Sequence, residues 1–336
     1  MQSDDHATAA RRAALSGVRV AVTGGAGFIG SQVVTQLVRA RADVKVIDDM
    51  SSGCLENLSG AYELGLARDR DVRIVDVRSA ACVAAIAEWR PDVVVHLAAQ
   101  VSMPAAVRSP LTDADINIRG TVNVLEASVR AGVGLIVYAA TAAIYGTVPA
   151  ESLPVTENTA IAPVSPYGMS KATALGYVQW FHQHRSLPYT ALALGNVYGP
   201  GQCRLDRGVI ASVANTLARG GVPCISGDGQ QTRDFVHVTD VADAVTLACT
   251  RGGRGLVNIA SGVETTVNDI YRSVAAHLGV RGEPRRGAAV ADEARRMVMD
   301  ISRARDALGW QPRVPLHDGI AQVITEARHQ SLGVTA

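Results

Sequence analysis

The stretch AVTGGAGFIG, at residues 21–30, lies between an apolar run and a helical pattern. The run VRVAVT (18–23) is rich in β-branched residues, as is typical of a buried strand. Gly24, Gly27 and Gly30 follow at three-residue spacing and open the helical pattern of residues 29–40. Backbone N–H groups at such a turn, together with the helix N-terminus, attract a pyrophosphate. This stretch therefore predicts a dinucleotide-binding β-α-β unit at the start of the fold.

The alternation of strand and helix continues over the first two hundred residues. Further apolar runs that predict parallel strands lie at 44–48, 72–77, 92–98, 135–141 and 189–194. Helical periodicity occurs between them at 81–89, 115–131 and 166–183. This order predicts an α/β fold, with a Rossmann-type doubly wound parallel sheet and a smaller C-terminal α/β lobe.

The chain is expected to divide into three parts. Residues 1–16 are interpreted as a disordered N-terminal extension and residues 17–195 as the dinucleotide-binding domain. From residue 196 to 330 shorter elements separated by glycine-rich loops predict a substrate-binding lobe, whose elements can interleave with the sheet.

Composition excludes several classes of protein. A formal charge of +1 over 336 residues gives no electrostatic reason to bind nucleic acid or a membrane surface. No apolar run has the length of roughly 20 residues that spans a bilayer, and residues 1–17 lack a signal-peptide core. The five cysteines are scattered without a C-x-x-C pair, so neither a metal site nor a disulfide framework is expected. These features favour a cytoplasmic location.

Carboxylates at the ends of the second and third strands extend the cofactor site. Asp48 follows Gly30 by 18 residues, and a carboxylate there can accept both adenosine ribose hydroxyls. The same charge would repel the 2′-phosphate of NADP, so NAD is favoured. Asp76, at the end of the third strand, can accept a hydrogen bond from the adenine amine, although an ordinary loop carboxylate is an alternative at that position.

A catalytic set is predicted from Thr141, Tyr167 and Lys171. Tyr167 and Lys171 in SPYGMSK are four residues apart and share a helix face. A free tyrosine titrates near pH 10, and a neighbouring ammonium would stabilise its phenolate for use as a base. Thr141 ends the strand 135–141 and offers a hydroxyl to the same substrate alcohol. Lysine occurs only at positions 45 and 171, against 30 arginines, which makes Lys171 informative.

The chain resembles the extended short-chain dehydrogenase/reductase family, in its NAD-dependent nucleotide-sugar epimerase/dehydratase branch. The resemblance covers residues 17–330 and is strongest to enzymes of the UDP-glucose 4-epimerase type. The motifs that carry it are VTGGAGFIG, DDMSSG, HLAAQVS, DINIRGT, TAAIYG, SPYGMSK, GNVYGP, GDGQQTRDFVHVTDVADA and DISRARDALGW. It implies tightly held NAD, a UDP-sugar substrate, and a homodimer paired through helices 113–131 and 166–184.

The resemblance also implies roles for individual positions. Asn117 matches a helix asparagine near the cofactor, and Asn196 and Arg233 match contacts to the substrate diphosphate. Ser102, with Thr141 and Tyr167, matches a sugar contact. The further positions that match cofactor contacts are Phe28, Ile29, Ser52, Gly53, Val77, Leu97, Ala98, Ala99 and Gln100.

Two departures from the family pattern leave a phosphate ligand open. Ala193 stands where relatives often have arginine before the asparagine of NVYGP, and Val290 stands where a second diphosphate arginine is usual. The arginines that could substitute are Arg285, Arg286, Arg295 and Arg296.

Ala142 and Ala143 indicate the type of reaction. Related 4,6-dehydratases carry Asp-Glu after the catalytic threonine, and related decarboxylases carry a glutamate in this segment. Methyl groups cannot transfer protons, so epimerisation at C4 through a transient 4-keto sugar is favoured. A protein that binds NAD without turnover, and net oxidoreduction, are the alternatives.

The identity of the sugar stays open. Met297 matches the pocket wall that admits or excludes a 2-N-acetyl group, and it is smaller than the tyrosine of strict glucose-type enzymes. Arg204 and Arg207 fall in a loop from which UDP-glucuronate 4-epimerases direct an arginine at the carboxylate. UDP-glucose, UDP-N-acetylglucosamine and UDP-glucuronate are all compatible with these residues.

Overall fold

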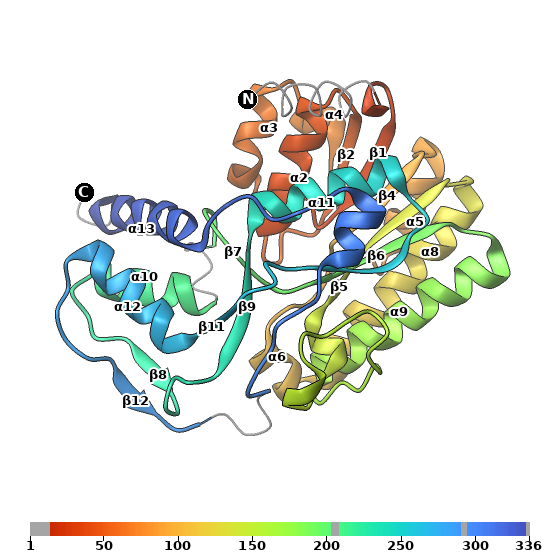
Figure 1. Cartoon of the computed structure of the whole chain (residues 1–336). Helices are drawn as coiled ribbons and strands as arrows, with labels where there is room; N and C mark the ends of the chain where they lie inside the picture. The colour runs from red at the N-terminus through yellow and green to blue at the C-terminus, as the bar shows by residue number, and fades with distance from the viewer. Residues whose placement is uncertain (1–13, 203–207, 290–293, 334–336) are drawn as a thin grey trace.

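A seven-stranded parallel sheet forms the centre of the computed structural model, which describes residues 14–202, 208–289 and 294–333 (Figure 1). The strands lie in the order β10-β6-β5-β4-β1-β2-β3. Their bounds are β1 (Arg19–Thr23), β2 (Asp43–Asp48), β3 (Val72–Ile74), β4 (Val93–His96), β5 (Leu135–Thr141), β6 (Tyr189–Leu194) and β10 (Gly255–Ile259). From the neighbouring strands β1 and β4, the strand order proceeds outward in opposite directions, through β2 to β3 on one side and through β5 and β6 to β10 on the other. This is the doubly wound arrangement, which confirms the predicted fold class.

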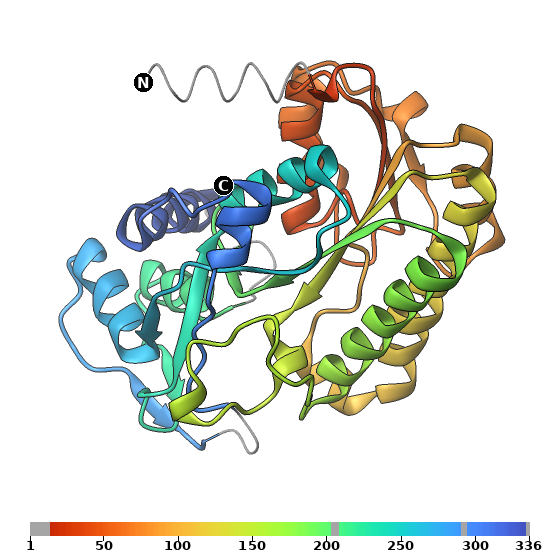
Figure 2. The same ribbon diagram turned by 45° about the vertical axis from the view of Figure 1, so that its right-hand side comes forward.

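Helices cover both faces of this sheet, as continuous apolar strands require. On one face lie α2 (Phe28–Arg39) and α11 (Val238–Arg251), and on the other lie α5 (Ala80–Trp89), α8 (Gly120–Ala131) and α9 (Pro166–Arg185) (Figures 1 and 2). Successive residues of β1 divide between the two resulting cores. Val20 and Val22 join the α2 side, and Ala21 joins the α8 side.

The helix predicted at 115–131 is not uniform. Its first five residues form the π-helical segment η2 (Asp115–Arg119), which continues from α7 (Pro110–Ala114) into α8. A π-helical turn inside a longer helix often marks a functional site. Here it carries Asn117, one of the predicted cofactor positions.

A second layer of smaller sheets and helices packs beside the large sheet. Strands β7 (Asn196–Tyr198), β9 (Thr232–His237) and β11 (Glu264–Thr266) form one sheet, and β8 (Cys224–Ser226) pairs with β12 (Arg285–Gly287). Helices α10 (Val209–Ala218), α12 (Val267–Leu278) and α13 (Leu316–Gly333) gather around a third apolar core (Figure 1). The remaining short elements are η1 (Leu55–Leu58), α3 (Ser59–Glu63), α4 (Arg68–Asp71), α6 (Met103–Arg108), η3 (Ala142–Tyr145), η4 (Ala150–Ser152) and η6 (Ala304–Leu308).

Segments of the C-terminal half also belong to the large sheet. β10 pairs in parallel with β6, and α11 packs on α2, where Gln36 Nε2 donates to the Thr239 carbonyl at 3.2 Å. Sequence position alone therefore does not separate the two layers, and the boundary at residue 195 stays a prediction.

One N-terminal residue corrects the predicted extension. Leu15, assigned above to the disordered segment 1–16, is 1% exposed and belongs to the core beneath α2. An apolar side chain buried this way gains about 1.5–3 kcal/mol, so the folded part begins before residue 17.

Within the described ranges, no helix combines the length and the apolar character needed to cross a bilayer.

Candidate active site

Thr141 and Tyr167 meet where β5 ends beside the start of α9. Thr141 Oγ1 accepts from the Ala143 N–H at 3.2 Å and so begins η3. Ser165 caps α9 by accepting from the Gly168 N–H at 3.1 Å. A Cβ at position 168 would lie 2.7 Å from the Ala143 carbonyl, so glycine allows the first turn of α9 to approach η3. The Thr141 hydroxyl lies close enough to the Tyr167 phenol to lower its pKa.

The protonation of Tyr167 and Lys171 is controlled by burial. Burial raises the pKa of Tyr167 to about 12, the Thr141 hydroxyl lowers it, and the negative charge of Asp113 raises it further. Burial lowers the pKa of Lys171 to about 7, and Asp113 acts in the opposite direction. Lys171 is 3% exposed, and its Nζ lies 4.3 Å from the Tyr138 ring centroid. Tyr167 needs added positive charge to act as a base at neutral pH.

Asn117 is buried at the centre of a polar network that joins three elements. Its Oδ1 accepts from the Gln100 N–H at 2.8 Å, and its Nδ2 approaches the Gln100 carbonyl at 3.0 Å. The same Nδ2 lies 3.2 Å from Asp113 Oδ1 and 3.0 Å from Ser170 Oγ. The loop after β4 is thereby fixed to α7 and to the residue beside Lys171.

The glycine-rich turn and Asp48 lie together as a dinucleotide site requires. Asp48 is 6% exposed, and its two oxygens accept from the Ala26 and Met50 N–H groups, each at 2.9 Å. Burial raises the pKa of Asp48, and these backbone donors oppose that effect. A Cβ at position 30 would lie 2.0 Å from the Gly24 carbonyl, so only glycine lets α2 begin this close to the turn. Asp48 and the open backbone of the turn fit the ribose and pyrophosphate of NAD.

Asp76 lies at the predicted adenine end but has a protein partner in this structure. Arg78 donates to it from Nε at 3.0 and 2.9 Å and from Nη2 at 2.5 Å, and Arg78 Nη1 also donates to Asp115 at 2.6 Å. Side-chain hydrogen bonding by Arg78 lowers the pKa of Asp76. The adenine contact stays a prediction, because Arg78 already occupies both carboxylate oxygens.

The other predicted cofactor positions line the carboxyl ends of the strands. Leu97 N–H donates to the Thr23 carbonyl at 3.1 Å, and Ala98 N–H donates to Thr23 Oγ1 at 3.3 Å. The ring of Phe28 borders Gly201, where a Cβ would lie 3.5 Å from Phe28 Cδ2. Val77 is buried, Ser52 is exposed, and Ile29, Gly53, Ala99, Gln100 and Ser102 are half-buried.

Two predicted diphosphate residues lie on adjacent strands of the smaller sheet. Asn196 pairs in register with Phe235, two residues after Arg233 on β9, so Asn196 and Arg233 share a face. Asn196 is exposed, and Arg233 Nη1 donates to the Thr232 and Ala294 carbonyls at 2.6 and 2.8 Å. Met297 is 6% exposed in the same apolar cluster as Ala142.

Several arginines that bear on phosphate or sugar binding have partners or lie outside the described ranges. Arg295 donates to both Asp228 oxygens and Arg296 to both Glu264 oxygens, at 2.6–2.9 Å. Arg286 donates to Asn268 Oδ1 at 2.9 Å. Arg204, Arg207 and Val290 fall outside the described residues.

Sequence reasoning missed Asp113 and Ser170. Asp113 is 1% exposed although a helix-face aspartate is normally solvated. A usable signal was its position four residues before Asn117, which places both side chains on one helix face. Ser170 precedes Lys171 directly and offered no pattern of its own.

Comparison with known proteins places this geometry in a family. The model of the NAD dependent epimerase/dehydratase family matches residues 20–260. A UDP-glucose 4-epimerase of Mycolicibacterium smegmatis is 38% identical over 94% of this chain and 100% of its own length. The solved structure of UDP-glucose 4-epimerase with UDP-glucose from Thermotoga maritima has a TM-score of 0.87 at 35% identity, covering 93% of this chain and 99% of that one.

A second solved structure contains the cofactor. UDP-glucose 4-epimerase of Thermus thermophilus in complex with NAD has a TM-score of 0.85 at 34% identity, over 93% of this chain and 99% of that one. These matches confirm the family resemblance and its NAD cofactor, which Asp48 and the glycine turn are predicted to hold. The chain belongs to the NAD-dependent epimerase/dehydratase family.

Proposed function

We propose that this chain is an NAD-dependent 4-epimerase of a UDP-hexose, of the UDP-glucose/UDP-galactose type. The observation that carries the proposal is the pair Ala142 and Ala143 in η3, directly after Thr141. Ala142 is 7% exposed, and Ala143 lies against the first turn of α9. The two positions closest to the catalytic hydroxyl therefore hold methyl groups. Neither can protonate or deprotonate C5 or C6 of a sugar.

The chain's own residues account for the proton transfers at C4. Tyr167 accepts the proton of the C4 hydroxyl as the transition state develops, and the hydroxyl of Thr141 donates a hydrogen bond that stabilises the phenolate. The Lys171 ammonium adds positive charge to the same site. Bound NAD⁺ supplies a hydride acceptor that later returns the hydride to C4.

Inversion requires the sugar to turn while its nucleotide stays bound. The 4-keto sugar rotates about its phosphate linkage, and Tyr167 returns its proton when C4 is reduced from the opposite face. Asn196 and Arg233, on one face of the smaller sheet, are positioned to retain the diphosphate during this rotation. No external reductant is consumed, because the two hydride transfers cancel.

UDP-N-acetylglucosamine and UDP-glucuronate are the alternative substrates. Met297 belongs to the apolar cluster that contains Ala142 and stands where strict glucose-type enzymes have a tyrosine. The smaller side chain favours room for a 2-N-acetyl group and therefore supports UDP-N-acetylglucosamine. Arg204 and Arg207 would favour a uronic acid through a charge-assisted hydrogen bond.

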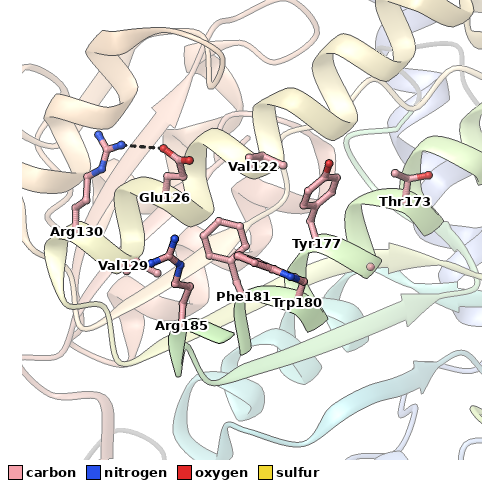
Figure 3. Close-up of a pocket in the computed structure, with 10 residues that line it drawn as sticks. Val122, Glu126, Val129, Arg130, Thr173, Tyr177, Trp180, Phe181 and Arg185 are labelled. Atoms are coloured by element: carbon pink, nitrogen blue, oxygen red, sulfur yellow. Dashed lines mark hydrogen bonds and ion pairs between the residues drawn. The ribbon is translucent and has the colours of Figure 1, made fainter. Parts of the chain in front are cut away.

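We also propose that two copies pair through α8 and α9. A groove of about 570 Å³ lies on this face, and Figure 3 shows Tyr177, Trp180 and Phe181 of α9 beside Glu126 and Arg130 of α8. Tyr177 and Trp180 are 43% and 44% exposed. Exposed aromatic side chains rimmed by charges are typical of protein interfaces. A second copy is the occupant that the family resemblance implies.

The function is tested by separate incubation with UDP-glucose, UDP-N-acetylglucosamine and UDP-glucuronate, followed by chromatographic separation of the C4 epimers. The proposal expects UDP-galactose from UDP-glucose, with no net formation of reduced nicotinamide. Loss of water or carbon dioxide from the sugar would refute it.

A further inference from the structure

Asp113 is a buried carboxylate that the reaction scheme above leaves without a task. It lies on α7 and is 1% exposed. Oδ1 accepts from Gln100 Nε2 at 2.8 Å and lies 3.2 Å from Asn117 Nδ2. Oδ2 is buried and has no hydrogen-bond partner in the part of the chain that the structure describes. A buried charge is costly unless another charge compensates it, so this carboxylate requires a counter-charge.

The hydrogen bonds around Asp113 lead to that charge. Asn117, which lies against Asp113 Oδ1, also contacts Ser170, the residue directly before the buried Lys171 on α9. Burial lowers the pKa of Lys171, and the charge of Asp113 opposes that effect. His96 on β4 lies near Lys171, and burial lowers the pKa of His96 to about 3, so it is neutral. From β5, burial raises the pKa of Tyr138, which is neutral as well. Asp115, two residues after Asp113, is engaged with Arg78 and Arg119.

Lys171 is therefore the cation that remains for Asp113 among the described neighbours. The two side chains form no direct ion pair in the described structure, in which the amides of Gln100 and Asn117 hold Oδ1. In a dry interior, however, charges interact over longer distances than in water. Asn117 also contacts Ser170, which fixes the spacing between α7 and α9.

We propose that Asp113 is the buried counter-charge of Lys171, a positioning residue that keeps the lysine in its ammonium form beside Tyr167. It acts through Lys171 and does not touch the reacting atoms. The side-chain amides of Gln100 and Asn117 hold its carboxylate in place. The proposal depends on the proposed function only for the catalytic task of Lys171.

The two lysines of the chain supply a direct measurement and a matched control. Lys45 Nζ lies 3.4 Å from Asp71 Oδ1, and Asp71 is 2% exposed. Asp71→Asn therefore removes a buried carboxylate beside the other lysine, far along the sheet from the site. Because only Lys45 and Lys171 are present, isotope labelling of lysine gives two side-chain signals. Loss of one signal in Lys171→Met assigns them.

The test is a pH titration of these signals by NMR in the NAD-loaded enzyme without substrate. In Asp113→Asn the pKa of Lys171 is expected to fall by about one unit or more, a tenfold change in proton affinity. In Asp71→Asn only Lys45 should respond. An unchanged Lys171 pKa in Asp113→Asn overturns the proposal, even if activity falls, because a purely structural role would lower activity alone.

A stability cycle keeps the proposal testable if Asp113→Asn folds poorly. Lys171→Met leaves Asp113 without its counter-charge and should lower Tm at neutral pH, and Asp113→Asn/Lys171→Met should regain most of that loss. Additive losses would overturn the proposal. Neither experiment uses substrate, so a failed epimerase assay leaves both results interpretable.

Discussion

Asn117 Nδ2 and Ser170 Oγ lie 3.0 Å apart and join the π-helical segment η2 to α9. Ser170 Oγ also donates to the Tyr167 carbonyl at 3.0 Å. The start of α9 is thus held by the Ser165 cap and by Asn117 through Ser170. The position of the Tyr167 hydroxyl depends on elements that lie well apart in the sequence.

Tyr167→Phe is expected to remove epimerisation and leave the fold intact. The substitution deletes one hydroxyl whose contribution as a general base is about 10²–10⁴-fold in rate. NAD content, measured after denaturation of the purified protein, should match the unaltered chain. Tyr62→Phe is the matched control and should keep full activity, because it removes a hydroxyl on α3 that has no hydrogen-bond partner among the described residues. Epimerisation at the normal rate in Tyr167→Phe would contradict the assignment of the base.

Asp48→Asn should weaken NAD binding and reduce the preference for NAD over NADP. Hydrogen bonds to a charged group contribute about 1.5–3 kcal/mol, so about a 10- to 100-fold loss of affinity is expected. Titration calorimetry on cofactor-stripped enzyme measures both constants. Asp49→Asn removes the same charge from the next, exposed residue and should change neither. Equal losses in the two variants would argue against a specific ribose contact.

Arg204→Ala tests whether the segment 201–208 directs an arginine at a sugar carboxylate. If Arg204 faces a sugar carboxylate, kcat/KM for UDP-glucuronate should fall by about 10-fold or more, because a charged hydrogen bond is lost, while UDP-glucose is little affected. Arg219→Ala, beyond the end of α10, is the control. Similar changes for both sugars would remove the main support for the glucuronate alternative.

Trp180→Glu should convert a dimer into monomers of 35.1 kDa. Burying a carboxylate without a partner in an apolar interface costs several kcal/mol, and each 1.4 kcal/mol weakens association about tenfold. Light scattering coupled to size exclusion gives the mass directly. Val222→Glu places the same charge on another exposed apolar position, 50% exposed, and should leave the mass unchanged. A monomeric unaltered chain would refute the proposed pairing.

The large sheet was predictable because its strands are buried on both faces. Runs such as VRVAVT and LIVYAAT are apolar over most of their length, without the strict alternation of a strand that has one solvated face. The segment GLVNI (255–259) forms β10 but was not predicted, since five residues between glycine-rich loops carry no periodicity that distinguishes strand from loop. Its place beside β6 arises from tertiary packing.

The candidate site was predictable where chemistry limits the choice of residue. A tyrosine base needs an ammonium on the same helix face, and this requirement is visible in the spacing of Tyr167 and Lys171. A pyrophosphate turn needs glycines between a strand and a helix, and these are visible as well. For Asp113 the sequence offers only its helical spacing from Asn117, and its burial depends on Gln100 and Asn117, which enclose it only in the folded chain. The same holds for Asp76, whose engagement by Arg78 depends on the path of the loop after β3.

The pairing of β10 with β6 has a consequence for biosynthesis. During synthesis the first six strands emerge before residue 200, and the outer edge of β6 then has no neighbour until residues 255–259 leave the ribosome. An uncovered strand edge is a template for association with other chains. A fragment that ends near residue 200 should therefore aggregate, and adding a separately made 196–336 fragment during refolding should rescue it.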